Sequence, residues 1–124
     1  MKLNPSGLTG ARVLVVEDSW DVSAGLKALL EAWGAEVIGP VATADDARRL
    51  VSARIPDVAL VDINLRHGER SYGLVDEMRG LGVPVVLITG YANVPPVKDK
   101  AAAILQKPFD DRHLLATLRA VKRS

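Results

Sequence analysis

The chain has 124 residues, 48% of them hydrophobic and 25% charged, which suits a single folded domain. With 16 basic and 15 acidic residues the formal net charge is +1, so no single-sign surface points to nucleic acid or a membrane as a partner. The absence of cysteine excludes disulfides, zinc–thiolate sites and thiol nucleophiles.

The N-terminal segment, residues 1–10, is expected to be a flexible arm, and residues 11–124 are expected to form one compact domain. The first ten residues contain no apolar core of a signal peptide, and no apolar run approaches the length of a membrane span. These features predict a cytoplasmic protein.

Short runs rich in valine, isoleucine and leucine alternate with helical spacing along the whole chain, as in parallel sheets covered on both faces. In chain order the pattern predicts a strand at Val13–Val16, a helix marked by Val22 to Trp33, a strand at Glu36–Ile38, a helix marked by Ala47 to Arg54, a strand at Val58–Val61, a helix marked by Leu74 to Leu81, strands at Val83–Ile88 and Ala103–Leu105, and a helix marked by Leu114 to Val121.

Turn and capping residues agree with these boundaries. Thr43 with Asp46 three residues later resembles a capping box, and Asp110 can cap the last helix. Gly34 and Gly82 follow helix ends, where a left-handed residue is favoured. Five strands with helices between them predict right-handed crossovers, and therefore an α/β fold with a doubly wound, five-stranded parallel sheet.

Two proline-containing stretches interrupt the pattern. Gly39-Pro40 is expected to close the second strand with a turn. Pro95-Pro96 lies between the fourth and fifth strands, where a helix would otherwise follow, and interior prolines break helices. The fourth helix is therefore expected to be short or irregular, with at most a turn near Val97–Ala102.

Polar residues come directly after four of the predicted strands, and the carboxyl ends of parallel strands are where ligands bind in such sheets. They are Glu17 and Asp18, Asp62 and Asn64, Thr89 and Gly90, and Lys107 and Pro108. Taken singly, each has a structural explanation, such as a helix cap, a turn or a strand end. Taken together, three carboxylates at one edge repel unless they are protonated or a cation enters.

Mg²⁺ is the cation that suits this set, because it prefers oxygen ligands and keeps several waters. A metal ion beside a carboxylate, a hydroxyl and a lysine meets the needs of phosphoryl transfer. An aspartate oxygen can attack phosphorus, and Lys107 would neutralise a phosphoryl oxygen. Thr89 would donate a hydrogen bond to another oxygen, and Gly90 leaves room for the phosphoryl group.

At this point the sequence resembles the receiver domain of two-component response regulators over nearly its whole length. The resemblance rests on the acids of VLVVEDS, the aspartate of LVDIN, the hydroxyl of VLITG and the Lys-Pro pair of LQKPF. It implies the flavodoxin-like strand order 2-1-3-4-5 and a receiver domain over 11–124 with no output domain. It also implies that Asp62 is the phosphoacceptor.

The resemblance further implies a Mg²⁺ site, which Mn²⁺ can also fill. Asp18 would be a direct ligand, Glu17 a largely water-mediated one, and Asn64 would contribute its backbone carbonyl. In this family the peptide bond between Lys107 and Pro108 is typically cis.

The segment DINLRHGERSYGLVDEMRGLGVPVVLITGYANVPPV is similar to single-domain receivers called the FAT GUY group. The shared features are the NL-x-x-GE-x-SY-like segment, the TGY stretch and the proline-bearing connection before KPF. That group is mostly alphaproteobacterial and often accompanies histidine kinases of the HWE type in stress signalling.

The sequence also departs from common receivers. The position of the usual aromatic switch residue, three before the lysine, is Ile104, so Tyr91 is a candidate substitute that would act with Thr89. The Thr89-to-Lys107 separation, 107 − 89 = 18 positions, is about one helical turn shorter than is usual.

The leading hypothesis is a bacterial single-domain response regulator. It would take a phosphoryl group from a histidine kinase onto Asp62 and act by binding a partner, or as a phosphate sink or relay. A histidine phosphotransferase or a downstream regulator would be a further partner, and no enzyme activity on a separate substrate is expected.

Three other classes of protein share part of this pattern. A pseudo-receiver would bind partners without phosphorylation. An aspartyl-nucleophile phosphatase usually carries an Asp-x-Asp pattern after its first strand, where this chain has Glu17-Asp18. A nucleotide or flavin binder is not supported, since no glycine-rich phosphate loop follows a strand.

Overall fold

The computed structural model describes residues 7–63, 71–90 and 100–122, and within them a five-stranded parallel sheet forms the centre of the domain. The strand order is β2-β1-β3-β4-β5, so the predicted doubly wound α/β fold with order 2-1-3-4-5 is confirmed. The strands are β1 (Arg12–Val16), β2 (Glu36–Val41), β3 (Val58–Asp62), β4 (Val85–Thr89) and β5 (Ala103–Gln106).

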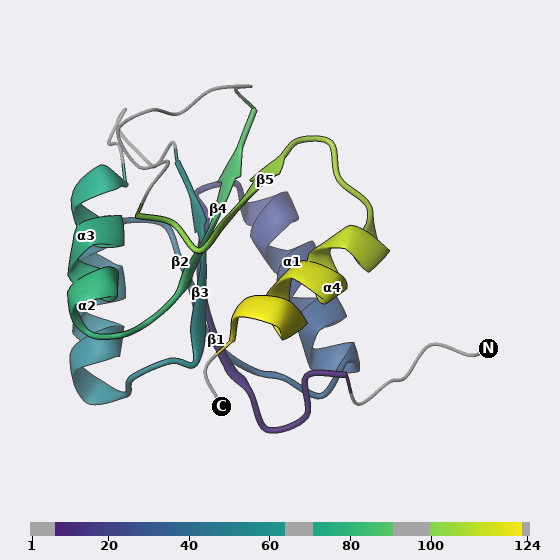
Figure 1. Cartoon of the computed structure of the whole chain (residues 1–124), viewed down its shortest axis with the longest axis horizontal. Coiled ribbons are helices and arrows are strands. Elements are labelled where there is room, and N and C mark those ends of the chain that lie inside the picture. Colours follow the sequence, from purple (N-terminus) through teal and green to yellow (C-terminus); the bar gives the residue numbers. More distant parts are fainter. Residues whose placement is uncertain (1–6, 64–70, 91–99, 123–124) are drawn as a thin grey trace.

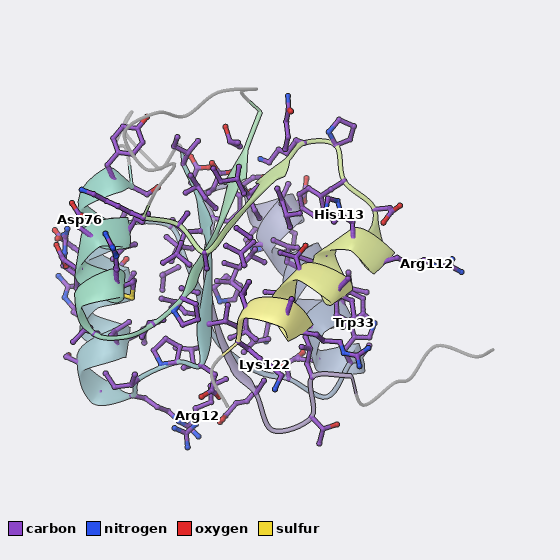
Figure 2. The ribbon with its side chains drawn as sticks, viewed as in Figure 1. Arg12, Trp33, Asp76, Arg112, His113 and Lys122 are labelled. Carbon is purple, nitrogen blue, oxygen red and sulfur yellow. The ribbon has the colours of Figure 1, made fainter. Side chains whose placement is uncertain are left out.

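Four helices in the described residues cover the two faces of the sheet: α1 (Trp20–Ala32), α2 (Ala44–Ala53), α3 (Tyr72–Gly80) and α4 (Asp111–Val121). Figure 1 shows α2 and α3 on one face and α1 and α4 on the other. Each face has its own apolar core, because alternate strand residues point to opposite sides. Asp76 on α3 and Arg112 on α4 project outward on opposite sides of the domain (Figure 2).

The central strands explain the continuous apolar runs of the sequence. Every residue of β3 and β4 is buried, including Asp62 and Thr89 at their carboxyl ends. Strands covered on both faces have no solvent side on which polar residues would alternate. The carboxyl ends are therefore held by packing on two sides.

The expected helix boundaries are confirmed at their caps. The Thr43 hydroxyl accepts a hydrogen bond from the Asp46 backbone N–H at 3.1 Å, and the Asp110 carboxylate accepts one from His113 N–H at 2.7 Å. Gly34 and Gly82 have φ values of 91° and 76°, the left-handed conformation in which a side chain is disfavoured.

The second strand differs from its prediction. Gly39-Pro40 does not close β2, which continues through a register irregularity to Val41. The fourth strand also begins later than predicted. Val83 donates its N–H to the Met78 carbonyl and lies in the turn after α3, and β4 begins at Val85.

The folded domain begins earlier than expected. Leu8 is fully buried, and its N–H donates to the Trp33 carbonyl at 2.9 Å. Gly10 N–H donates to the Gly34 carbonyl at 3.3 Å. Residues 7–10 therefore pack against the end of α1 because Leu8 supplies an apolar anchor, and only residues 1–6 of the expected arm lie outside the described residues.

The predicted irregular segment lies largely outside the described residues, which exclude 91–99. Residues 100–102 form a turn and bends, and the described residues contain no helix between β4 and β5. In the part of the chain that the structure describes, no helix has the length and apolar character needed to cross a membrane.

Replacing Leu8 by alanine should lower the free energy of unfolding by about 2–4 kcal/mol, because it leaves a cavity in the core against α1. Urea denaturation followed by circular dichroism measures this. Leu81→Ala is the control, since Leu81 is 49% exposed and its truncation should cost far less. Equal losses in the two variants would contradict a core role for Leu8.

Candidate functional site

Four neighbouring strands bring the predicted site residues to one edge of the sheet. Asp62 ends β3, which lies between β1 and β4, and Thr89 ends β4. Glu17 follows β1, where Val16 pairs with Val61, and Lys107 follows β5, where Gln106 pairs with Thr89. Residues far apart in the sequence thus meet because parallel strands end together.

Lys107 joins two of the acids. Its ammonium group donates a hydrogen bond to Asp62 Oδ2 at 2.8 Å and lies 3.7 Å from Glu17 Oε1. The two carboxylates are almost entirely buried, whereas the lysine side chain is 42% exposed. A partly solvated cation therefore offsets the charge of two desolvated acids.

Glu17 is the more perturbed of these acids. Burial, and next the negative charge of Asp62, raise the pKa of Glu17 from 4.5 to about 7, against the opposing effect of Lys107. Its Oε2 accepts a long hydrogen bond, 3.4 Å, from the Ser19 backbone N–H. Its Oε1 is buried and has no hydrogen-bond partner among the described residues, so this oxygen retains a lone pair for a ligand.

The pKa of Lys107 is raised, although burial alone would lower it. Burial lowers it, but the hydrogen bond and charge of Asp62, together with the charge of Glu17, raise it above its usual value. The lysine is therefore a fixed cation at neutral pH, suited to hold a negatively charged group.

The remaining predicted residues take up supporting positions. Thr89 is 1% exposed, and its carbonyl accepts the Lys107 N–H at 2.7 Å. Gly90 is exposed, and a Cβ there would meet nothing within 4 Å. The peptide bond between Lys107 and Pro108 is cis, as the family resemblance implied.

The metal-ligand set is only partly placed. Asp18 follows Glu17 and is partly exposed, but Asn64 and the switch candidate Tyr91 lie outside the described residues. Within the described residues, no group of three acidic, histidine or cysteine side chains is arranged to hold a metal ion. In the structure Asp62 and Glu17 face Lys107 instead.

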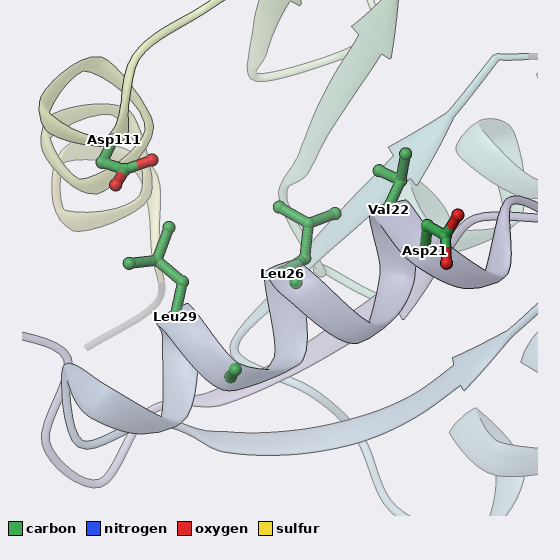
Figure 3. Close-up of a pocket in the computed structure, with 7 residues that line it drawn as sticks. Asp21, Val22, Leu26, Leu29 and Asp111 are labelled. Atoms are coloured by element: carbon green, nitrogen blue, oxygen red, sulfur yellow. The ribbon is translucent and has the colours of Figure 1, made fainter.

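A shallow groove of about 560 Å³ runs along α1, the helix that begins three residues after Glu17. Figure 3 shows Val22, Leu26 and Leu29 along one side of α1, with Asp111 of α4 opposite. Asp21 lies at the end nearest the acids, three residues after Asp18. Trp20, the first residue of α1, is 79% exposed and follows Asp18 by two positions.

One positioning contact was not foreseen from the sequence. The Glu17 backbone N–H donates to the Val41 carbonyl at 2.9 Å, across the irregular part of β2. The sequence signal for this contact is the Gly39-Pro40 pair inside an apolar run, although such a pair by itself predicts a turn.

Comparisons with known proteins agree with this geometry. The sequence profile described as "Response regulator receiver domain" matches residues 13–119. Protein Rrf1 of Nitratidesulfovibrio vulgaris is 38% identical over 113 residues, which cover 86% of this chain and 78% of that protein.

Solved structures show the same fold. A CheY-like receiver domain from Methylobacillus flagellatus superposes with a TM-score of 0.79 at 25% identity, over 90% of this chain and 98% of that one. The response regulator PhyR from Brucella abortus superposes with a TM-score of 0.82 at 24% identity, over 96% of this chain. The chain spans only 50% of that PhyR structure.

The pKa of Glu17 predicts a pH-dependent stability in the absence of divalent cations. The unfolded chain releases this proton near pH 4.5 and the folded chain near pH 7, so stability should fall as the pH rises between these values. The loss should be at most about 3 kcal/mol. Urea denaturation between pH 4.5 and 7.5 measures it.

Glu17→Gln should remove this part of the pH dependence, because its amide does not titrate. Glu31→Gln, at an exposed position of α1, should keep the wild-type slope. If both variants showed the wild-type slope, Glu17 would not be the titrating group.

Proposed function

The chain belongs to the response regulator receiver domain family, and from this premise we propose that it accepts a phosphoryl group on Asp62 from a phosphohistidine of a histidine kinase. The observation that carries the proposal is the contact of 2.8 Å between Lys107 Nζ and the buried carboxylate of Asp62. It fixes a nucleophile and a cation for the incoming phosphoryl group at one point of the sheet edge.

The transfer exchanges one bond to phosphorus for another. A carboxylate oxygen of Asp62 bonds to phosphorus while the bond from phosphorus to the histidine nitrogen breaks, and its electron pair stays on the imidazole. Lys107 is close enough to pass from the carboxylate to a phosphoryl oxygen. The open space around Gly90 leaves room at the edge for that group.

The acids of the site fit a Mg²⁺ ion. Glu17 Oε1 lacks a hydrogen-bond partner among the described residues, and carboxylate oxygens are the ligands that Mg²⁺ prefers. We propose that Asp18 and Asp62 bind the ion directly and Glu17 through water, with the Asn64 carbonyl completing the set. When bound, Mg²⁺ offsets the charge of the carboxylates and of the phosphoryl oxygens.

We further propose that the phosphorylated domain signals by binding a partner, or that it acts as a phosphate sink or relay. In either case it does not turn over a separate substrate. An acyl phosphate adds roughly 1.5–2 negative charges at this edge, enough to shift a two-state equilibrium. The apolar groove along α1 is where a helix of the phosphodonor would approach, because α1 begins directly after the acidic pair.

Some relatives suggest an alternative, an interaction module that works without phosphorylation. The PhyR structures similar to this chain include that of an anti-anti-sigma factor from Bartonella quintana. The buried acid, the paired lysine and the buried threonine favour the phosphoacceptor, because an interaction module has no need of them.

Asp62→Asn should abolish phosphorylation, since the amide oxygen is a far weaker nucleophile. Intact-mass analysis after incubation with a small phosphodonor and Mg²⁺ should show one added phosphoryl group on the wild-type protein and none on the variant. Asp76→Asn, on the outer face of α3, should be phosphorylated like the wild type. Equal phosphorylation of Asp62→Asn would reject the assignment.

We propose that Tyr91 takes the place of the aromatic switch residue, because the usual position of that residue holds Ile104. Tyr91→Ala should leave phosphorylation intact and weaken phosphorylation-dependent binding to the partner. Binding of the phosphorylated variant to the cognate kinase or downstream regulator tests this. An unchanged affinity would rule out the switch role.

A further inference from the structure

Strand β2 contains one residue more than the stretch of β1 with which it pairs. In the pairing of β1 with β2, Leu14 lies opposite Ile38, but Val16 lies opposite Val41. A step of two residues on β1, 16 − 14, thus matches a step of three on β2, 41 − 38. This is a β-bulge, a feature that often stands beside functional sites and redirects the chain.

Glycine is required at the bulge. Gly39 has a φ of 92°, in the region that disfavours side chains. A Cβ at this position would lie 2.9 Å from Val41 N and 3.1 Å from Val15 O. Both are backbone atoms of the two paired strands, so a side chain would have to displace one strand from the other.

One of the two residues that would be displaced, Val41, also binds the backbone of Glu17. The Glu17 N–H donates to the Val41 carbonyl at 2.9 Å, and Val15 precedes Glu17 by two residues on β1. Glu17 is 4% exposed, and its carboxylate lies 3.7 Å from Lys107. A shift of a few tenths of an ångström at Val41 or Val15 is therefore passed to the start of the Glu17-Asp18 pair.

We infer that Gly39 is a positioning residue for the acidic pair. Gly39 permits the bulge, and the bulge places the Val41 carbonyl where it accepts the Glu17 N–H. This hydrogen bond sets the position of Glu17 and Asp18 at the carboxyl end of β1. This inference rests on the proposed function, in which these acids bind Mg²⁺ beside Asp62.

Gly34 offers a matched control for Gly39→Ala. Its φ is 91°, and a Cβ there would lie 2.7 Å from Thr9 Oγ1 and 3.1 Å from Thr9 Cα. The backbone strain of Gly34→Ala is therefore similar, but Gly34 precedes β2, at the opposite edge of the sheet from the acids. A loss of stability alone would affect both variants.

The experiment compares Mg²⁺ affinity by isothermal titration calorimetry, at a temperature where urea denaturation shows all proteins folded. Gly39→Ala should bind Mg²⁺ about 10-fold more weakly than the wild type, the size of effect typical for groups that orient metal ligands. Its phosphorylation by a small phosphodonor should require correspondingly more Mg²⁺. Gly34→Ala should keep the wild-type Mg²⁺ affinity.

Wild-type affinity in Gly39→Ala, or an equal loss in Gly34→Ala, would overturn the inference while leaving the proposed function standing. A wild-type protein that bound no Mg²⁺ would instead count against the proposed function. If Gly39→Ala did not fold, amide hydrogen exchange in the wild type decides: protection of the Glu17 amide without Mg²⁺ supports the inference, and free exchange overturns it.

Discussion

The structure depends on one electrostatic constraint, the placement of two nearly buried carboxylates at the same edge of a sheet. Burial and the negative charge of Asp62 both disfavour the charged form of Glu17. Lys107, reaching in from the end of β5, offsets this charge. The strand order places that lysine there, because β5 is the edge strand and lies two strands from β3. The order of the strands therefore determines which side chains meet at the site.

The architecture follows from patterns that the sequence shows directly. Runs such as Val58–Val61 have no polar alternation because helices cover both faces, and residues after parallel strands meet at one edge. What the patterns missed depends on single contacts. The buried side chain of Leu8 fixes residues 7–10, which the sequence predicts to be a flexible arm. Gly39 allows β2 to continue to Val41, where the sequence predicts that the strand ends. Local propensity cannot reveal either, since each is decided by a partner distant in sequence. The unmatched oxygen of Glu17 is likewise a product of the fold alone.

Similarity at 24–38% identity places the chain in its family and fixes its fold, but the function is a property of the site. Similar domains occur both as nearly whole chains and as about half of a longer one. The features that bear on function are therefore local: a buried aspartate, a lysine in contact with it, and an apolar groove along α1.

The contact of Lys107 with both acids has a consequence for regulation. A divalent cation at the proposed site would draw on the same carboxylates as the ammonium group. Each would weaken the binding of the other, and by reciprocity the coupling would be equal in both directions. With the proposed Mg²⁺ bound, the lysine would be an exchangeable counterion, and its pairing with the acids would raise the metal concentration needed to fill the site. The backbone N–H of the same lysine donates to the Thr89 carbonyl at 2.7 Å, so one residue contacts the buried acids through its side chain and the end of β4 through its backbone.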